Sequence, residues 1–232
     1  MYRIVAGTAV LLAVVAGTAG PAQAHNPPGT ANDPRLVKVT DGGGTIGFDD
    51  ARNAPGSPQP KALRMHTIEF GKVRGDVRNV GILGRALGDV ERISYKFRDG
   101  AAITSSPTRL SVGLSNGHWL FLRARNSGCA DLNFGGGWFK ANFMAPECVI
   151  DATTEAPDDP ATSVNEHETS YTGWQNVLAG NSADSGEGPG EGAGTIVEKV
   201  RIVERGGGTA WVDDIRLDGV LFAGPNVSTH NH

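Results

Sequence analysis

The chain has 232 residues, a formal net charge of −4, 33 glycines, 13 prolines and two cysteines. This length fits one domain or two small ones, and a glycine content of about 14%, twice the average of about 7%, favours many tight turns over a helical protein. The mild acidity excludes the strongly basic surface with which proteins hold phosphate backbones, so no nucleic-acid partner is expected.

Residues 1–24 have the three parts of a secretory signal peptide. Arg3 supplies a positive charge, residues 4–17 form an apolar stretch, and Ala22-Gln23-Ala24 has the small residues of a cleavage site. The apolar stretch is shorter than the roughly 20 residues that a spanning helix needs, and no later stretch is long enough. We therefore predict cleavage after Ala24 and a secreted, extracellular chain without a membrane span.

After the predicted cleavage site the sequence divides into a leader, one domain and a tail. Residues 25–35 are polar and contain prolines, as is typical of a flexible leader, and residues 224–232 form a polar tail. Within residues 36–223, apolar residues recur at every second position in short segments bounded by Gly, Asn, Asp or Pro, which is the pattern of β-strands. The clearest segments are 93–97, 109–114, 199–202 and 211–217. About ten such strands and no convincing amphipathic helix predict a β-sandwich or barrel.

One turn can be assigned from a motif. Residues 113–117 (GLSNG) match the G-x-S-x-G pattern of a nucleophilic serine, but that pattern works only where a helix follows the serine. Residues 118–123 have the character of a strand instead, and Asn116-Gly117 supplies the positive φ angles of a type I′ turn. We therefore predict a hairpin here and no catalytic serine.

The segment 119–123 is apolar on both of its faces. Trp119 and Phe121 share one face, and Leu120 and Leu122 share the other, because side chains alternate along a strand. Either both faces are covered by the rest of the chain, or one of them lines a ligand groove.

Cys129 and Cys148 are the two cysteines. In an oxidising compartment an even count predicts a disulfide, and closing a loop of about 20 residues is worth about 3 kcal/mol in the chain-entropy model. The segment between the two cysteines contains no His, which argues against a metal site.

Two segments interrupt the pattern of strands. Residues 151–169 carry six acidic residues and two prolines, and residues 180–194 consist almost entirely of Gly, Ser, Glu, Asp and Pro. Both compositions are typical of long loops.

An acidic residue lies on the predicted core face of residues 211–217. Asp213 has the same parity as Trp211, Ile215 and Leu217, and a buried carboxylate needs a cation, hydrogen-bond donors or a proton. A structural calcium ion would satisfy this need, with Asp49 or Asp50 as a second ligand if the first and last strands pair. A salt bridge or backbone hydrogen bonds at the strand end would satisfy it equally well.

Three segments resemble strands of one group of secreted proteins. Residues 60–65 (PKALRM), 93–97 (ISYKF) and 211–219 (WVDDIRLDG) are similar to the early, an internal and the closing strand of β-jelly-roll carbohydrate-binding modules and their concanavalin-like relatives. The resemblance covers most of residues 36–223. It implies an all-β, two-layer antiparallel β-sandwich (jelly roll) with long Gly-rich and acidic loops, and a structural calcium ion held by Asp213.

The chain departs from that group in two respects. The binding faces of the group are rich in aromatic residues, whereas Phe, Trp and Tyr make up 6% of this chain. Catalytic jelly-roll relatives carry clustered acids or strand motifs that combine basic and acidic residues, and no such string is present in this sequence. We therefore assign no catalytic residue.

Ligand contacts are expected from aromatic side chains that are flanked by turns, since exposed rings stack on the apolar faces of sugars. Trp138 follows a glycine triplet, and Tyr171 and Trp174 follow the acidic segment. Arg123 or Lys140 would donate hydrogen bonds.

The expected function is that of a secreted, non-catalytic binding module for a glycan or another extracellular surface, in which the disulfide and the calcium ion are structural. One alternative is a polysaccharide-degrading jelly-roll enzyme, a lyase or hydrolase, which requires acids and a His in one groove. The other is a structural or interaction protein of the cell envelope, which requires a flat surface poor in aromatic rings.

Overall fold

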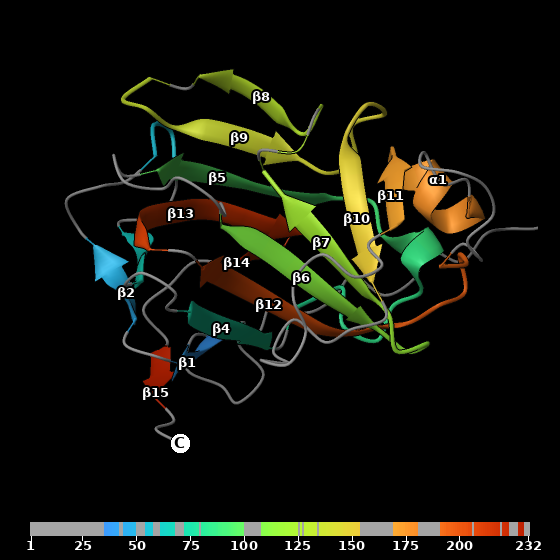
Figure 1. The fold of residues 1–232 in the computed structure, drawn as a ribbon, viewed down its shortest axis with the longest axis horizontal. Coiled ribbons are helices and arrows are strands. Elements are labelled where there is room, and N and C mark those ends of the chain that lie inside the picture. Colours follow the sequence, from blue (N-terminus) through green and yellow to red (C-terminus); the bar gives the residue numbers. More distant parts are fainter. Residues whose placement is uncertain are drawn as a thin grey trace, which may run out of the picture.

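The chain folds into two antiparallel β-sheets that pack face to face (Figure 1). The computed structural model describes residues 35–41, 44–49, 54–57, 61–67, 72–78, 80–99, 108–124, 126, 128–133, 135–153, 169–180, 191–205, 207–218, 220–222 and 227–229. The alternating pattern predicted a β-sandwich or barrel, and the two-layer sandwich that the resemblance implied is confirmed. The predicted signal peptide (residues 1–24) lies outside the described residues, as does the predicted leader except for Arg35.

Sheet A has eight strands in the order β11-β10-β7-β6-β12-β4-β1-β15. Neighbours are antiparallel, except that β15 runs parallel to β1. The strand β15 falls within the segment predicted as a polar tail. The bounds are β1 (Arg35–Asp41), β4 (Lys72–Arg78), β6 (Arg109–Leu114), β7 (Trp119–Arg123), β10 (Val149–Thr153), β11 (Thr169–Thr172), β12 (Val197–Arg205) and β15 (Val227–Thr229).

Sheet B has seven strands, six of them in the order β2-β3-β13-β5-β9-β8, with β14 paired to β13. The bounds are β2 (Thr45–Asp49), β3 (Ala62–Thr67), β5 (Ile93–Asp99), β8 (Ala130–Asn133), β9 (Phe139–Asn142), β13 (Gly208–Leu217) and β14 (Val220–Phe222). A single turn of 3-10 helix, η1 (Leu87–Asp89), precedes β5.

The chain passes between the sheets in the order of a jelly roll. The strands β3, β13, β5 and β9 are neighbours in sheet B, and β4, β12, β6 and β7 are neighbours in sheet A. Consecutive strands such as β3 and β4, β5 and β6, or β12 and β13 therefore lie on opposite sheets, which is the connectivity of a rolled pair of Greek keys. The jelly-roll expectation is confirmed at the level of the fold.

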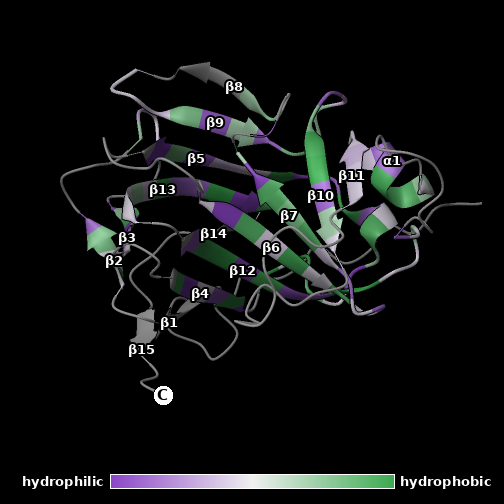
Figure 2. Ribbon diagram, in the orientation of Figure 1, coloured by the Kyte–Doolittle hydropathy of each residue, from purple (hydrophilic) through white to green (hydrophobic). Residues whose placement is uncertain are grey.

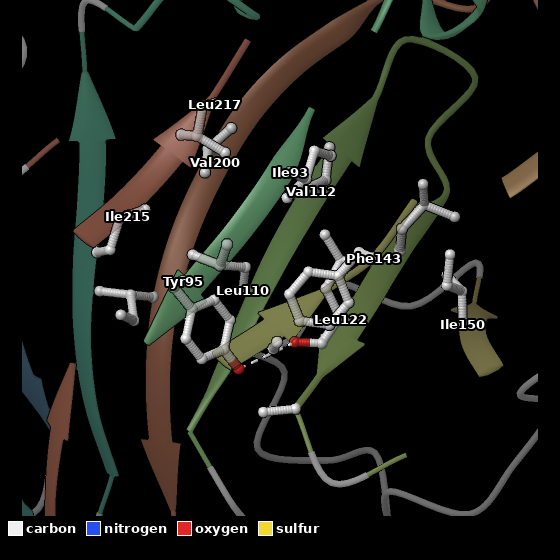
Figure 3. Packing of buried hydrophobic residues seen from close by; sticks show 14 of the residues in the cluster. Ile93, Tyr95, Leu110, Val112, Leu122, Phe143, Ile150, Val200, Ile215 and Leu217 are labelled. Atoms are coloured by element: carbon white, nitrogen blue, oxygen red, sulfur yellow. Dashed lines mark hydrogen bonds between the residues drawn. The ribbon is translucent and has the colours of Figure 1, made fainter. Parts of the chain in front are cut away.

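Alternate side chains of both sheets fill the space between the sheets. Figure 3 shows Tyr95 of β5 and Phe143 facing Leu110 and Leu122 of sheet A, and all four are buried. The hydroxyl of Tyr95 donates a hydrogen bond to the carbonyl oxygen of Thr108 at 2.8 Å, so its polar end is satisfied inside the core.

The predicted disulfide between Cys129 and Cys148 is confirmed, and both cysteines are buried. Gly128, next to Cys129, has a φ angle of +73°, and a Cβ atom at this position would lie 2.1 Å from the carbonyl oxygen of Glu147. Only glycine allows the two backbone segments to approach this closely beside the disulfide.

The predicted hairpin between β6 and β7 is confirmed, but its turn type differs from the prediction. Of the turn residues, Gly117 alone has a positive φ angle, +87°, so Asn116 does not have the conformation that a type I′ turn requires. The N–H of Leu114 bonds to the carbonyl of His118, and the N–H of Gly117 bonds to the carbonyl of Leu114. This is the three-residue hairpin in which a type I turn is followed by a left-handed glycine.

A short helix lies between the two predicted loops, although the sequence pattern predicted no helix. The helix α1 (Trp174–Ala179) follows β11 and ends at Gly180, which has a left-handed conformation. The first three residues of the predicted acidic loop belong to β10, while residues 154–168 and 181–190 lie outside the described residues. Among the described residues, no helix has both the length and the apolar character that crossing a membrane requires.

Candidate functional site

The three aromatic residues predicted to contact a ligand are buried. Trp138, Tyr171 and Trp174 are 2%, 2% and 3% exposed. Trp138 packs with Trp211 in a small apolar cluster on sheet B, and the other two belong to the main core. The prediction that these rings present an exposed surface for sugars is therefore wrong, because turns flank them in sequence but the folded chain directs them inward.

Burial also changes the chemistry of Tyr171. Removal of its hydroxyl from water, and secondarily the negative charge of Glu191, raise the pKa of Tyr171 above its ordinary value. The hydroxyl is therefore held in its neutral form, which suits a core position.

The two predicted hydrogen-bond donors are not brought together. Lys140 is half-buried in β9 of sheet B, whereas Arg123 ends β7 in sheet A. Arg123 forms an ion pair with Asp151 of β10. Asn126 and Ser170 donate hydrogen bonds to the same carboxylate at 3.0 and 2.8 Å, so this network joins β7, β10 and β11.

A β-bulge in β13 changes the face that Asp213 occupies. The pairing of β13 with β5 shifts register between Asp213 and Arg216. Val212 before the shift, and Ile215 and Leu217 after it, all belong to the core cluster. Asp213 therefore lies on the outer face of sheet B, and the prediction that it shares the core face with Ile215 and Leu217 is wrong, since one extra residue reverses the alternation.

Asp213 is fully buried because the segment 54–57 covers it. Its carboxylate accepts hydrogen bonds from the backbone N–H of Ala54 at 2.9 Å, the hydroxyl of Ser57 at 2.8 Å and the backbone N–H of Asp214 at 2.7 Å. Of the two alternatives for this carboxylate, the geometry supports hydrogen bonding.

Positive charge near Asp213 comes from the protein itself. The ammonium group of Lys96 lies 3.2 Å from Asp214 and donates a hydrogen bond to the carbonyl of Pro55 at 3.1 Å. Arg216 approaches the same carboxylate of Asp214 at 2.8 Å. The oxygens around Asp213 thus already have N–H, O–H and ammonium partners, and these residues do not fit a calcium site.

The other predicted calcium ligands do not change this result. Asp49 accepts a hydrogen bond from the indole N–H of Trp211 at 3.0 Å, and Asp50 lies outside the described residues. Within the part of the chain that is described, no group of three or more His, Cys, Asp or Glu side chains is arranged to hold a metal ion.

The outer face of sheet A, which points away from the core, combines aromatic rings with arginines. Trp119 and Phe121 project from β7 onto this face, and they are 6% and 4% exposed. The guanidinium of Arg201 lies over Trp119 at 4.6 Å from the ring centroid, and those of Arg109 and Arg123 lie 4.2 and 5.3 Å from the centroid of Phe121. These distances are those of cation–π contacts. Of the two alternatives for β7, the structure shows that both faces are covered.

Beside Arg201 the chain has a pocket of about 410 Å³, which we call the β4–β12 pocket. Three apolar and five charged side chains line it. The charged ones are Asp76 and Arg78 from β4, and Glu198, Lys199 and Arg201 from β12. The strands β4 and β12 are neighbours in sheet A (Figure 1), and Figure 2 shows that β12 carries both hydrophilic and hydrophobic residues.

A second bulge shapes this pocket. The pairing of β12 with β6 shifts register between Val197 and Lys199, so Glu198 is an extra residue in β12. The side chains of Glu198 and Lys199 are consequently both exposed, although regular alternation would place one of them in the core. The consecutive charged residues Glu198 and Lys199, at the start of the alternating segment 199–202, were the signal that could have indicated the bulge.

Ion pairs hold two of the lining residues, Asp76 and Arg201, in place. Asp76 lies 3.3 Å from Arg74 on its own strand and 3.2 Å from Arg201 on β12. The ring of Trp119 packs against the guanidinium of Arg201. The same ring lies over Gly113 of β6, where a Cβ atom on residue 113 would be 3.0 Å from the ring. Arg201 is therefore positioned by a carboxylate and by a ring together.

Positive charges predominate over negative ones on the outer face of sheet A. Among the side chains that the structure describes, this face carries twice as many cations as carboxylates, although the whole chain has a formal net charge of −4. The charged residues are Arg74, Arg78, Arg109, Arg123, Lys199 and Arg201, with Asp76, Asp151 and Glu198.

Comparison with known proteins does not extend the assignment beyond the fold: no protein-family model matches the chain, and no curated protein matches it.

Proposed function

We propose that this protein is a secreted, non-catalytic binding module that holds an extracellular glycan at the β4–β12 pocket. The observation that carries the proposal is the pocket itself, which is lined by five charged side chains and lies on a sheet of a jelly-roll fold. Its volume falls within the range of roughly 300–1,000 Å³ that is usual for small-molecule sites, so a sugar unit fits inside.

The side chains of the pocket suit a sugar. Arg78 and Lys199 supply hydrogen-bond donors, Asp76 and Glu198 supply acceptors, and sugar hydroxyls need both kinds of partner. The pocket is built on paired strands rather than on a free loop, so its donors and acceptors are held at fixed spacing.

The test is retention of the purified protein by immobilised polysaccharides, with a variant that fills the pocket. Leu83, a half-buried lining residue, is replaced by Trp; the matched control is Leu178→Trp, which enlarges another half-buried leucine, on α1. We expect the protein and the control to be retained by at least one polysaccharide and Leu83→Trp to be released. Retention of Leu83→Trp, with folding verified by circular dichroism, would place the ligand elsewhere and overturn the proposal.

A polysaccharide-degrading enzyme is the second candidate, because two carboxylates, Asp76 and Glu198, line the same pocket. Glycosidases use two carboxyl groups that flank the bond to be cleaved. The ion pairs of Asp76 with two arginines favour binding over catalysis, since this carboxylate already has two partners within the protein. New reducing ends that accumulate with the protein, but not with Glu198→Gln, would identify an enzyme.

A further inference from the structure

We infer that the ligand of the β4–β12 pocket is an acidic polysaccharide, whose sugar units carry carboxylate or sulfate groups. This inference rests on the proposed function and narrows it to one class of glycan.

The carboxylate of Asp76 is already compensated. It lies between Arg74 and Arg201, at 3.3 and 3.2 Å from their Nε atoms. Once this group is counted, the remaining charged side chains of the pocket are two cations, Arg78 and Lys199, and one carboxylate, Glu198. The part of the pocket that faces solvent is therefore net positive.

Both remaining cations are available to a ligand. Arg78 and Lys199 are exposed, and neither has an ion-pair partner within the described part of the chain. A carboxylate or sulfate group placed between them would accept charge-assisted hydrogen bonds, which are about twice as strong as those between neutral groups. A neutral sugar hydroxyl would leave both charges uncompensated.

Arg201 adds a preorganised cation to the pocket. Its guanidinium lies over Trp119 at 4.6 Å and contacts Asp76 through Nε. A planar guanidinium with a fixed orientation matches the two oxygens of a carboxylate better than a freely rotating group does. Little conformational entropy is then lost on binding.

The net negative charge of the chain means that an acidic polymer is attracted only to the outer face of sheet A and not to the molecule as a whole. The formal net charge is −4, so the molecule as a whole repels a polyanion at long range, and the excess of cations on the outer face of sheet A opposes this repulsion. Retention of a polyanion would therefore report a specific site and not general electrostatic adhesion. A polymer presents its acidic groups repeatedly, which raises their effective concentration at the pocket.

The experiment measures the dissociation constants of the purified protein for polygalacturonate, chondroitin sulfate and neutral dextran by biolayer interferometry. The pocket variants are Arg78→Gln, Lys199→Gln and the double variant; Arg64→Gln is the matched control, since Arg64 is an exposed arginine of β3 in sheet B. Glu198→Gln removes the carboxylate that opposes an acidic ligand. The uronate and sulfate polymers separate the two kinds of acidic group.

We expect binding to at least one acidic polymer and none to dextran. Each single cation variant should bind about threefold more weakly and the double variant about tenfold more weakly, as for exposed ion pairs, while Arg64→Gln is unchanged. Glu198→Gln should bind about threefold more tightly, an effect that loss of structure would not produce. Higher ionic strength should weaken all of these interactions.

Two results separate the inference from the proposed function. Equal binding of dextran and the acidic polymers, or a folded double variant that binds like the parent protein, would overturn the acidic-ligand inference and leave the glycan-binding proposal in place. Failure to bind any polysaccharide would remove the proposed function, and the inference with it.

Discussion

The carboxylate of Asp213 provides a test that separates hydrogen bonding from metal binding. Three donors converge on it: the N–H groups of Ala54 and Asp214, and the hydroxyl of Ser57, at 2.7–2.9 Å. Replacing Asp213 by Ala leaves all three without this acceptor at a fully buried position. Hydrogen bonds to a charged group contribute about 1.5 kcal/mol each at the lower end of their range, so the loss of all three should be about 4.5 kcal/mol.

A loss of this size is a large part of the total, since most domains are stable by about 5–15 kcal/mol. The assay is urea unfolding followed by tryptophan fluorescence, and the quantity compared is the free energy of unfolding. Ser57→Ala removes one of the three donors and leaves the backbone unchanged, so it should cost about 1.5 kcal/mol. The ratio of the loss in Ser57→Ala to the loss in Asp213→Ala gives the fraction of the stabilisation that the Ser57 hydroxyl contributes.

The same assay with a chelator gives the result that would refute the reasoning. If hydrogen bonds satisfy Asp213, EDTA and added calcium should leave the unfolding midpoint of the parent protein unchanged. A midpoint that falls with EDTA and recovers with calcium, together with a Ser57→Ala variant as stable as the parent, would show that a metal ion satisfies Asp213. The presence of Lys96 and Arg216 at the neighbouring carboxylate would then need another explanation.

Three further predictions concern stability. Replacing both Cys129 and Cys148 by Ser should lower the free energy of unfolding by about 3 kcal/mol, and thermal unfolding with and without reductant should show the same difference for the parent protein. Gly128→Ala should destabilise by more than about 1 kcal/mol, because its φ angle is +73° and a Cβ would lie 2.1 Å from a carbonyl oxygen; a midpoint equal to that of the parent protein would contradict this. Since burial, and then Glu191, raise the pKa of Tyr171 above 10.0, the folded state keeps this proton more tightly than the unfolded state. The stability that Tyr171 contributes is complete below pH 10 and falls as the pH rises above it, so Tyr171→Phe should reduce the alkaline decline in urea midpoints.

The strands, the hairpin and the disulfide could be predicted from the sequence because each depends on neighbouring residues or on compartment. Alternation of apolar residues marks a strand wherever the strand lies in the fold. Residues 93–97 form most of β5, and residues 109–114 form all of β6. The glycine of the hairpin was identified correctly, but the type of the turn was not. The pair Asn116-Gly117 is compatible both with a type I′ turn and with a type I turn followed by a left-handed glycine, and these turns differ in the twist of the strands they join.

The candidate site could not be predicted in the same way. Trp138, Tyr171 and Trp174 have neighbours typical of turns, yet they are buried, because the exposure of a ring is decided by what packs on it and not by what flanks it. The β4–β12 pocket combines Arg78 with Glu198 and Lys199, residues that lie far apart in the chain and meet only because β4 and β12 pair in sheet A.

By itself, the alternation of residues determined that this protein is built of β-strands, in a sandwich or a barrel, and the cysteine pair determined one covalent link. The tertiary structure decided where that alternation is interrupted. The bulge after Asp213 moves this carboxylate from the core to the outer face of sheet B, and the bulge at Glu198 exposes two consecutive charged side chains in sheet A. The physical reason is that a period of two is a local property, whereas an extra residue in a strand is fixed only by the partner strands that pair on either side of it.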